Sequence, residues 1–389
     1  MSKPAVVITS MPPRTQSYFD WLLTGLGVLQ EEGRATLRFE DRWWNRALRA
    51  HPKVMAAAWR MGDDFVEFVS PMDAVCLTGR VELADKVVSF AMDVADAPFN
   101  FALGHLEAAD LYFKCQCPKS FEPEGYPLNR HVRIPYHPEV FRLQEKIRPG
   151  MLGRPLAVGT NLKKNLRVLR QWESAAAPRK DVRIFASFAH DRGVKPRTSR
   201  DPLPSAFNYE SENSLIKRWG DSIHHPNRKR ERIVEMLRRM EKADVNARIW
   251  RTENAAVGGP MLSDAEYREM VGRAAVVVNV SGLRRSLPFR FMDAFMSGAA
   301  VATDTIGTRW PKPWESGTEI FEFGDLGYEL DEEVDWKAVG KRFHEIYDWA
   351  GKSGEHFKVV QDLYRKKWAP QVYAGYVVDE CLKTMEERS

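Results

Sequence analysis

The most constraining feature of this sequence is a strand-like run that leads through a basic loop into a short helix. Residues 274–280 are almost entirely alanine and valine, as expected of a strand covered on both faces. A loop rich in glycine and arginine, 282–288, comes next, and 289–297 has the pattern of a helix that ends at Gly298. A second apolar strand, 299–303, follows at once. This order of elements predicts a parallel α/β sheet.

The first half of the chain shows the same rhythm. Residues 5–9 predict a buried strand and 35–39 a second one, with an intervening helix over 17–31 whose leucines recur at helical spacing. Further strand candidates follow at 74–77, 86–92 and 110–114. Ligands of open α/β sheets bind beyond the carboxyl ends of the strands, so functional residues are expected there.

A change of composition at residues 174–180 separates the two halves. This alanine-rich stretch ends in proline and basic residues, and a fresh strand over 182–188 follows it. Further along, residues 263–266 form a capping box with serine at the N-cap and glutamate at N3. We therefore predict two α/β domains, over residues 1–177 and 178–365.

The composition is that of a globular chain with a small positive charge. The 389 residues are 44% hydrophobic and carry a formal net charge of +5, which suits an anionic small molecule or membrane surface without implying nucleic acid. Cys115 and Cys117 lack the second pair that a zinc site needs, so ordinary buried thiols are expected. With no signal-peptide core and no apolar run of the roughly 20 residues that span a bilayer, a cytoplasmic protein is expected. Trp43 and Trp44 suit either the core or a membrane interface, which leaves peripheral membrane contact open.

The basic loop and the start of its helix have the outline of a phosphate site. Free backbone N–H groups and the positive end of the helix dipole meet there. Arg284, Arg285 and Arg290 add positive charge. Asp293 lies one turn after Arg290, where a carboxylate can accept hydrogen bonds from ribose hydroxyls while the arginine meets a diphosphate. The alternative is that the arginines are solvated and Asp293 is a structural ion-pair partner.

This segment resembles a known family. The run from Gly282 to Asp293, through Ser286 and an Arg-x-x-Asp-Ala motif at Arg290, is followed by Gly298 and an apolar strand. It is similar to the donor-binding segment of GT-B glycosyltransferases, closest to exostosin-like and family 1-like transferases, and the similarity extends over about residues 182–325.

The resemblance implies two Rossmann-like domains that face a central cleft, with a C-terminal helix over residues 366–389 returning to the N-terminal domain. It implies transfer of a sugar from a UDP- or GDP-linked donor to a hydroxyl of a glycan or other acceptor, in surface polysaccharide or glycoconjugate synthesis. Loop residues Arg284, Arg285 and Ser286, with Arg290 and Asp293, would hold the donor.

One departure concerns the stereochemistry. Many retaining GT-B enzymes carry two glutamates eight positions apart in this segment, and the position eight before Asp293 is Arg285. A retaining mechanism of that type is therefore not indicated, while the expected ribose contact at Asp293 is unaffected.

Two further loops of the C-terminal half hold candidates. His190 and Lys195 follow the strand over 182–188, and in GT-B folds the corresponding loop faces the cleft. His190 is a candidate catalytic residue and Lys195 a candidate donor contact; a mobile basic loop is the alternative. Asn254, after a strand over 247–250, is a candidate contact to the nucleobase.

An inverting transferase also needs a base that takes the proton of the acceptor hydroxyl. Asp93, directly after the strand over 86–92, is the first candidate, although a helix N-cap explains it equally well. Asp96 and His105 are others, and Arg14 is a candidate acceptor contact. A group of aromatic and basic residues would suit either a glycan surface or ordinary packing: Tyr112, Lys114, Lys119, Arg130, Arg133 and Tyr136.

Two other protein classes fit less well. The basic runs at 228–230 and 238–239 suggest nucleic-acid binding, yet glutamates interleave with them as on a solvated helix face. A dinucleotide-dependent oxidoreductase needs G-x-G-x-x-G after the first strand, where residues 9–14 read TSMPPR. The chain also lacks an Asp-x-Asp pair, which GT-A transferases use to hold a metal on the donor. Metal-independent transfer is therefore expected, with no cofactor besides the donor and no nucleic-acid partner.

Overall fold

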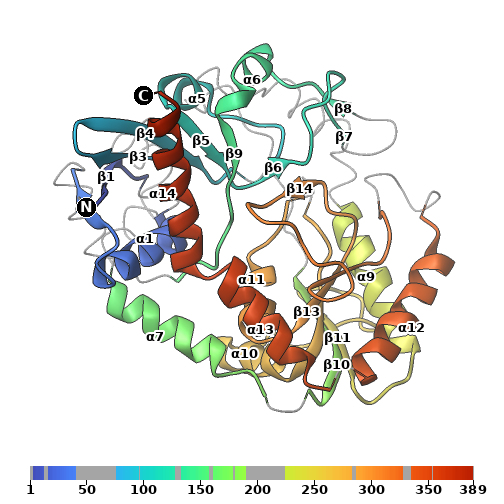
Figure 1. Cartoon of the computed structure of the whole chain (residues 1–389). Helices are drawn as coiled ribbons and strands as arrows, with labels where there is room; N and C mark the ends of the chain where they lie inside the picture. Colours follow the sequence, from blue (N-terminus) through green and yellow to red (C-terminus); the bar gives the residue numbers. More distant parts are fainter. Residues whose placement is uncertain are drawn as a thin grey trace, which may run out of the picture.

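The computed structural model shows a mixed α/β protein with two large sheets (Figure 1). It describes residues 3–12, 16–40, 76–95, 97–127, 133–156, 161–177, 180–189, 224–282, 286–326, 334–352 and 354–388.

The first half of the chain forms a six-stranded sheet in the order β2-β1-β3-β4-β5-β9. Its strands are β1 (Ala5–Ser10), β2 (Thr36–Phe39), β3 (Cys76–Leu83), β4 (Lys86–Asp93), β5 (Leu111–Lys114) and β9 (Ile147–Pro149). All run parallel to β1 except β3, which is antiparallel to both of its neighbours. The sequence led us to expect a parallel sheet, and the β3–β4 hairpin introduces one antiparallel strand into it.

Two helices that are distant in sequence cover one face of this sheet together. α1 (Gln16–Glu31) packs on α14 (Pro370–Glu387), which also contacts β3 and β4. The two backbones approach so closely that a Cβ at Gly25 would lie 2.0 Å from the carbonyl oxygen of Pro370. Figure 1 shows α14 beside the six-stranded sheet, with the C-terminus near α5 (Leu103–Ala108). The opposite face carries its own apolar cluster, which includes side chains of α5 and α6 (Pro138–Arg142).

The second half forms a five-stranded sheet, and all of its pairings are parallel. Its strands are β10 (Val182–Ala189), β11 (Val245–Trp250), β12 (Ala274–Val278), β13 (Ala300–Thr303) and β15 (Ile320–Glu322). In the order β11-β10-β12-β13-β15, the strand that follows β10 in sequence lies on one side of it, and the next three strands of this sheet lie on the other side. Such a reversal creates a switch point between β10 and β12, and open α/β sheets bind ligands at that place.

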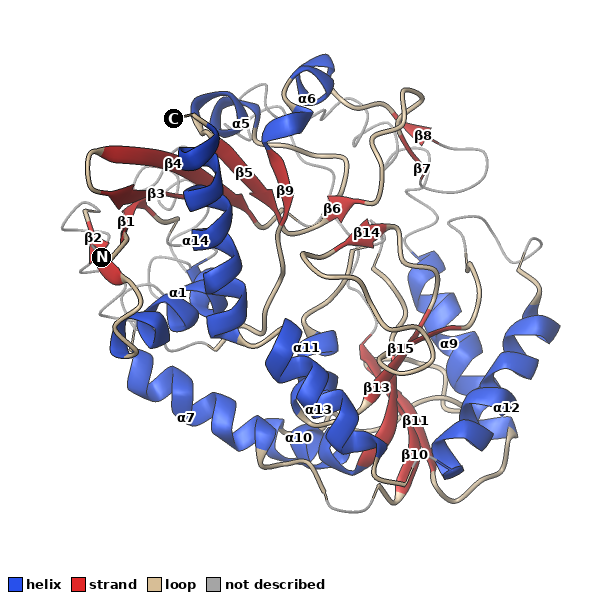
Figure 2. Cartoon of the chain, in the orientation of Figure 1, coloured by secondary structure: helices blue, strands red, loops and turns tan. Residues whose placement is uncertain are grey.

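Helices cover both faces of the second sheet (Figure 2). Side chains of α9 (His224–Arg239) and α12 (Trp336–Lys352) share one apolar cluster with the strands. Those of α10 (Asp264–Arg273), α11 (Arg290–Met296) and α13 (His356–Lys367) belong to the cluster on the other face.

Local sequence signals set the ends of two of these helices. The predicted capping box is confirmed, since Ser263 Oγ accepts from the Glu266 amide at 3.3 Å and the Glu266 carboxylate accepts from the Ser263 amide at 2.8 Å. Gly298 follows α11 with φ of 71°, the left-handed conformation that ends a helix and favours glycine. The predicted start of α11 was one residue early.

The two sheets are joined by direct contacts. β6 (Cys117–Pro118) pairs antiparallel with β14 (Thr308–Arg309), so each half contributes one strand to a small ladder. Gln116 exchanges two hydrogen bonds with the backbone of Leu287, both of 2.9 Å. α7 (Leu162–Glu173) leads from the first sheet to the second. The remaining ladder, β7 (Tyr126–Pro127) with β8 (Arg133–Ile134), lies within the first half.

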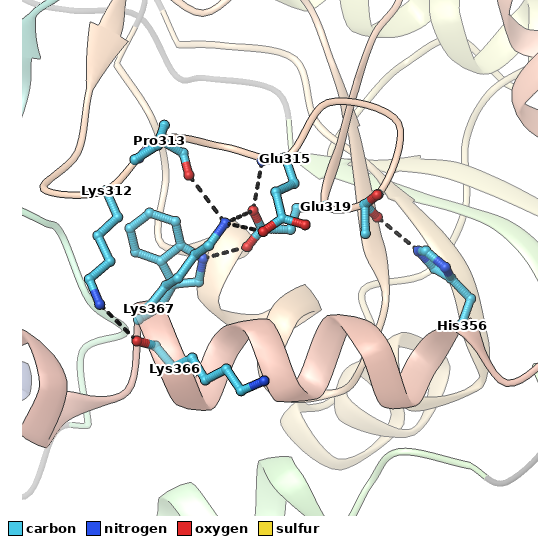
Figure 3. A network of polar contacts seen from close by, with 9 residues as sticks. Lys312, Pro313, Glu315, Glu319, His356, Lys366 and Lys367 are labelled. Atoms are coloured by element: carbon cyan, nitrogen blue, oxygen red, sulfur yellow. Dashed lines mark hydrogen bonds and ion pairs between the residues drawn. The ribbon is translucent and has the colours of Figure 1, made fainter.

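A buried carboxylate anchors the loop before β15 to the end of α13 (Figure 3). Glu319 has no exposed surface and accepts from Lys367 Nζ at 2.9 Å, from Trp368 Nε1 at 2.8 Å and from the Glu315 amide at 2.8 Å. Trp368 in turn accepts a hydrogen bond on its carbonyl from the indole of Trp21 at 3.0 Å. The Glu319 network therefore reaches from the second sheet to α1 of the first.

We predict that Glu319→Gln destabilises the fold by about 1.5–3 kcal/mol, because a neutral amide loses charge-assisted hydrogen bonds and turns one donor toward other donors. The matched control is Glu355→Gln. This substitution removes a surface ion pair with Lys358, in which the Glu355 side chain is 78% exposed, and should cost less than about 1 kcal/mol. Chemical denaturation of both variants measures the difference. Equal midpoints would mean that the network contributes nothing to stability.

Candidate functional site

Arg290 lies at the switch point of the second sheet. Its Nη1 is 3.4 Å from Oδ1 of Asn279, the residue after β12, and its Cζ is 5.4 Å from the ring centroid of Phe188, near the end of β10. Asn279 is itself fully buried and donates to Thr303 Oγ1, at the end of β13, at 3.1 Å. The guanidinium therefore spans the carboxyl ends of the two strands between which a ligand is expected.

Asp293 lies one turn further along α11 and is completely buried. Its Oδ1 accepts from Nη1 of Arg154 at 2.5 Å. Burial raises the pKa of this carboxyl, while Arg154 and, more weakly, Arg290 oppose the rise in pKa. The aspartate is therefore a core residue paired with an arginine from the first half.

Arg154 was not singled out in the sequence, because nothing local marks its role. Its guanidinium Cζ lies 4.1 Å from the ring centroid of Trp172 and 5.8 Å from that of Phe289. About 17% of its side chain remains exposed. Tyr267 of α10 lies beside these three residues. Burial and the charge of Asp293 raise the pKa of its hydroxyl, and the two arginines lower it.

Asp93 lies in a second buried cluster, at the ends of β4 and β5. Its carboxylate has no exposed surface and accepts from Lys114 Nζ at 2.9 Å, from the Tyr112 hydroxyl at 2.5 Å and from the Ala95 amide at 2.6 Å. A general base must reach the acceptor hydroxyl. In this arrangement Asp93 joins the ends of two strands, and its expected role as the base stays a prediction. Tyr112 and Lys114, expected as a possible glycan surface, are core residues.

The remaining candidates have local roles or lie outside the described residues. Asn254 shapes its own turn: its Oδ1 accepts from the Ala256 amide at 3.1 Å, and its carbonyl accepts from the amides of Val257 and Gly258. Ser286 is half-buried in the loop before α11, and Tyr136 is buried. Those outside the described part of the chain are Arg14, Trp43, Trp44, Asp96, Arg130, His190, Lys195, Arg284 and Arg285.

The cysteines, as expected, are buried free thiols. Burial raises the pKa of Cys115 to about 12, so this thiol is not a reactive nucleophile. Among the residues that the structure describes, no three histidine, cysteine or acidic side chains gather as a metal site would require. Within the same ranges, no helix combines the length and apolar character needed to cross a membrane.

Sequence comparison assigns the chain to no family. No protein-family model matches it, and no curated protein sequence matches it.

We predict that Asp93→Asn lowers stability by about 3–5 kcal/mol, because it leaves the buried ammonium of Lys114 without its counter-ion. Replacing both partners, as Asp93→Asn with Lys114→Met, should restore part of the loss, because no charge is then left buried and the amide oxygen still accepts from the Ala95 amide. Denaturant unfolding tests both variants. A fully stable Asp93→Asn protein that had lost catalytic turnover would contradict this structural role and support Asp93 as the base.

Proposed function

We propose that this chain is a metal-independent glycosyltransferase with the two-domain GT-B arrangement, and that its second sheet binds the diphosphate of a nucleotide sugar. The observation that carries the proposal is the place of Arg290. A guanidinium at the switch point of a parallel, doubly wound sheet is where the diphosphate of a nucleotide would be held.

The charges elsewhere in the second half favour this function over nucleic-acid binding. Two arginines of α9, one from each basic run, are engaged within the fold: Arg238 donates to the carbonyls of Ala247 and Gly258, each at 3.0 Å, and Arg230 to the carbonyl of Ala189 at 2.7 Å. An arginine bound to backbone carbonyls is not available as part of a phosphate track. Arg290 instead contacts side chains, Asn279 after β12 and Phe188 near the end of β10, where a small ligand would bind.

In the proposed reaction, Arg290 neutralises charge on the leaving diphosphate, and the first half, residues 1–177, binds the acceptor. The donor is UDP- or GDP-linked and the acceptor is a hydroxyl of a glycan or glycoconjugate. Asp93 and His190 are the proposed catalytic residues. Asp93 is buried at the end of β4, and His190 directly follows Ala189, the last residue of β10, in sequence.

We predict that Arg290→Ala weakens the binding of UDP or GDP by about ten- to a hundredfold, because the variant loses the charged hydrogen bonds between the guanidinium and the diphosphate. Arg365→Ala, which removes an exposed arginine paired with Asp362 on α13, is the matched control and should bind as wild type does. Isothermal titration calorimetry gives both affinities. A well-folded Arg290→Ala protein with unchanged affinity would remove α11 from the donor site.

We further predict that turnover survives EDTA, because arginine side chains take the place of a metal on the diphosphate. The assay measures nucleotide released from UDP- and GDP-sugars with and without the chelator. Activity that disappears in EDTA and returns with Mg²⁺ or Mn²⁺ would contradict the metal-independent mechanism.

A further inference from the structure

We propose that Arg154, from the first half of the chain, binds the donor diphosphate together with Arg290, and that the buried carboxylate of Asp293 holds Arg154 in place for this purpose. The inference deepens the proposed function and depends on it.

Accessibility distinguishes the two partners of this ion pair. Asp293 has no exposed surface, whereas about 17% of the Arg154 side chain is exposed. A ligand that arrives at the end of the sheet can therefore reach the arginine but not the carboxylate. The ribose contact expected of Asp293 is replaced by a supporting role: the carboxylate orients the residue that touches the ligand.

Charge also favours an anion at this place. Asp293 is the shared neighbour of two guanidinium groups, those of Arg154 and Arg290, and the third group beside it is the neutral phenol of Tyr267. Two guanidinium groups and one carboxylate leave these side chains with a net positive charge; Asp304 is linked to Arg290 through Thr303 and Asn279.

The geometry of Arg154 is fixed before any ligand binds. Its guanidinium lies on the indole of Trp172, and the ring centroid of Phe289, an exposed residue, is 5.8 Å from its Cζ. A planar cation held in this way keeps its free N–H donors in one orientation, which suits the forked recognition of phosphate oxygens.

The backbone that carries Arg154 is equally constrained. The Met151 amide donates to the Tyr373 hydroxyl, and the Leu156 amide to the Asp20 carboxylate, both at 3.1 Å. Between them Gly153 lies against Trp21, where an added Cβ would be only 2.0 Å from the indole. The first half thus presents one arginine rigidly to the switch point of the second sheet.

The test compares variants that separate ligand contact from folding. Arg154→Met alone would strand a buried carboxylate, so the main variant is Arg154→Met with Asp293→Asn, which removes both charges. Asp293→Asn alone keeps the arginine, and Arg154→Lys keeps the charge without the fork. Each is titrated by calorimetry with UDP, GDP and inorganic pyrophosphate, and its unfolding midpoint is measured.

We expect the double variant to bind nucleoside diphosphate at least about tenfold more weakly than Asp293→Asn, with Arg154→Lys between wild type and the double variant. The donor KM should rise in parallel while the acceptor KM stays unchanged. Pyrophosphate affinity that falls by the same factor would place the contact on the diphosphate rather than on the nucleoside.

A folded double variant that binds nucleotide as tightly as Asp293→Asn would overturn the inference and leave Arg154 with a structural role only. That outcome differs from failure of the proposed function, in which the wild-type protein itself binds neither UDP nor GDP.

Discussion

A carboxylate with no exposed surface needs a counter-ion. Asp293, in the second half of the chain, is paired with Arg154 of the first half. Burial of an isolated charge would cost several kcal/mol, and removal of one partner from a buried pair is more damaging than removal of both. The pair with Arg154 therefore restricts how the segment before α7 can lie against α11. That restriction brings residues of both sheets to the switch point of the second sheet.

Other contacts reinforce this placement. The apolar cluster that contains Asp293's helical neighbours Phe291 and Met292 also contains side chains of β1, α1 and α14. The ladder between β6 and β14 also joins the two halves, and the Gln116–Leu287 hydrogen bonds hold the loop that leads into α11. The geometry of the site is therefore tied to the packing of the whole molecule, as a preorganised electrostatic site requires.

The sequence predicted much of this architecture, for physical reasons that are visible in particular residues. The alanine–valine run at 274–278 is apolar on both faces because helices cover both faces of its strand, and Ser263 and Gly298 mark helix ends through their own hydrogen bonds and backbone conformation. The direction of β3 was not predictable, because an apolar strand pattern is the same for a parallel and an antiparallel strand. The roles of Asp93 and Arg154 were equally hidden: their partners lie 21 and 139 residues away, and no local pattern reports such contacts.

The most direct test of the central claim is a crystal structure of the protein with UDP or GDP bound. The account predicts the diphosphate at the carboxyl ends of β10 and β12, within hydrogen-bond distance of the Arg290 guanidinium. A nucleotide bound instead at the strand ends of the first sheet, or with its diphosphate remote from α11, would contradict the assignment of the donor site to the second half of the chain.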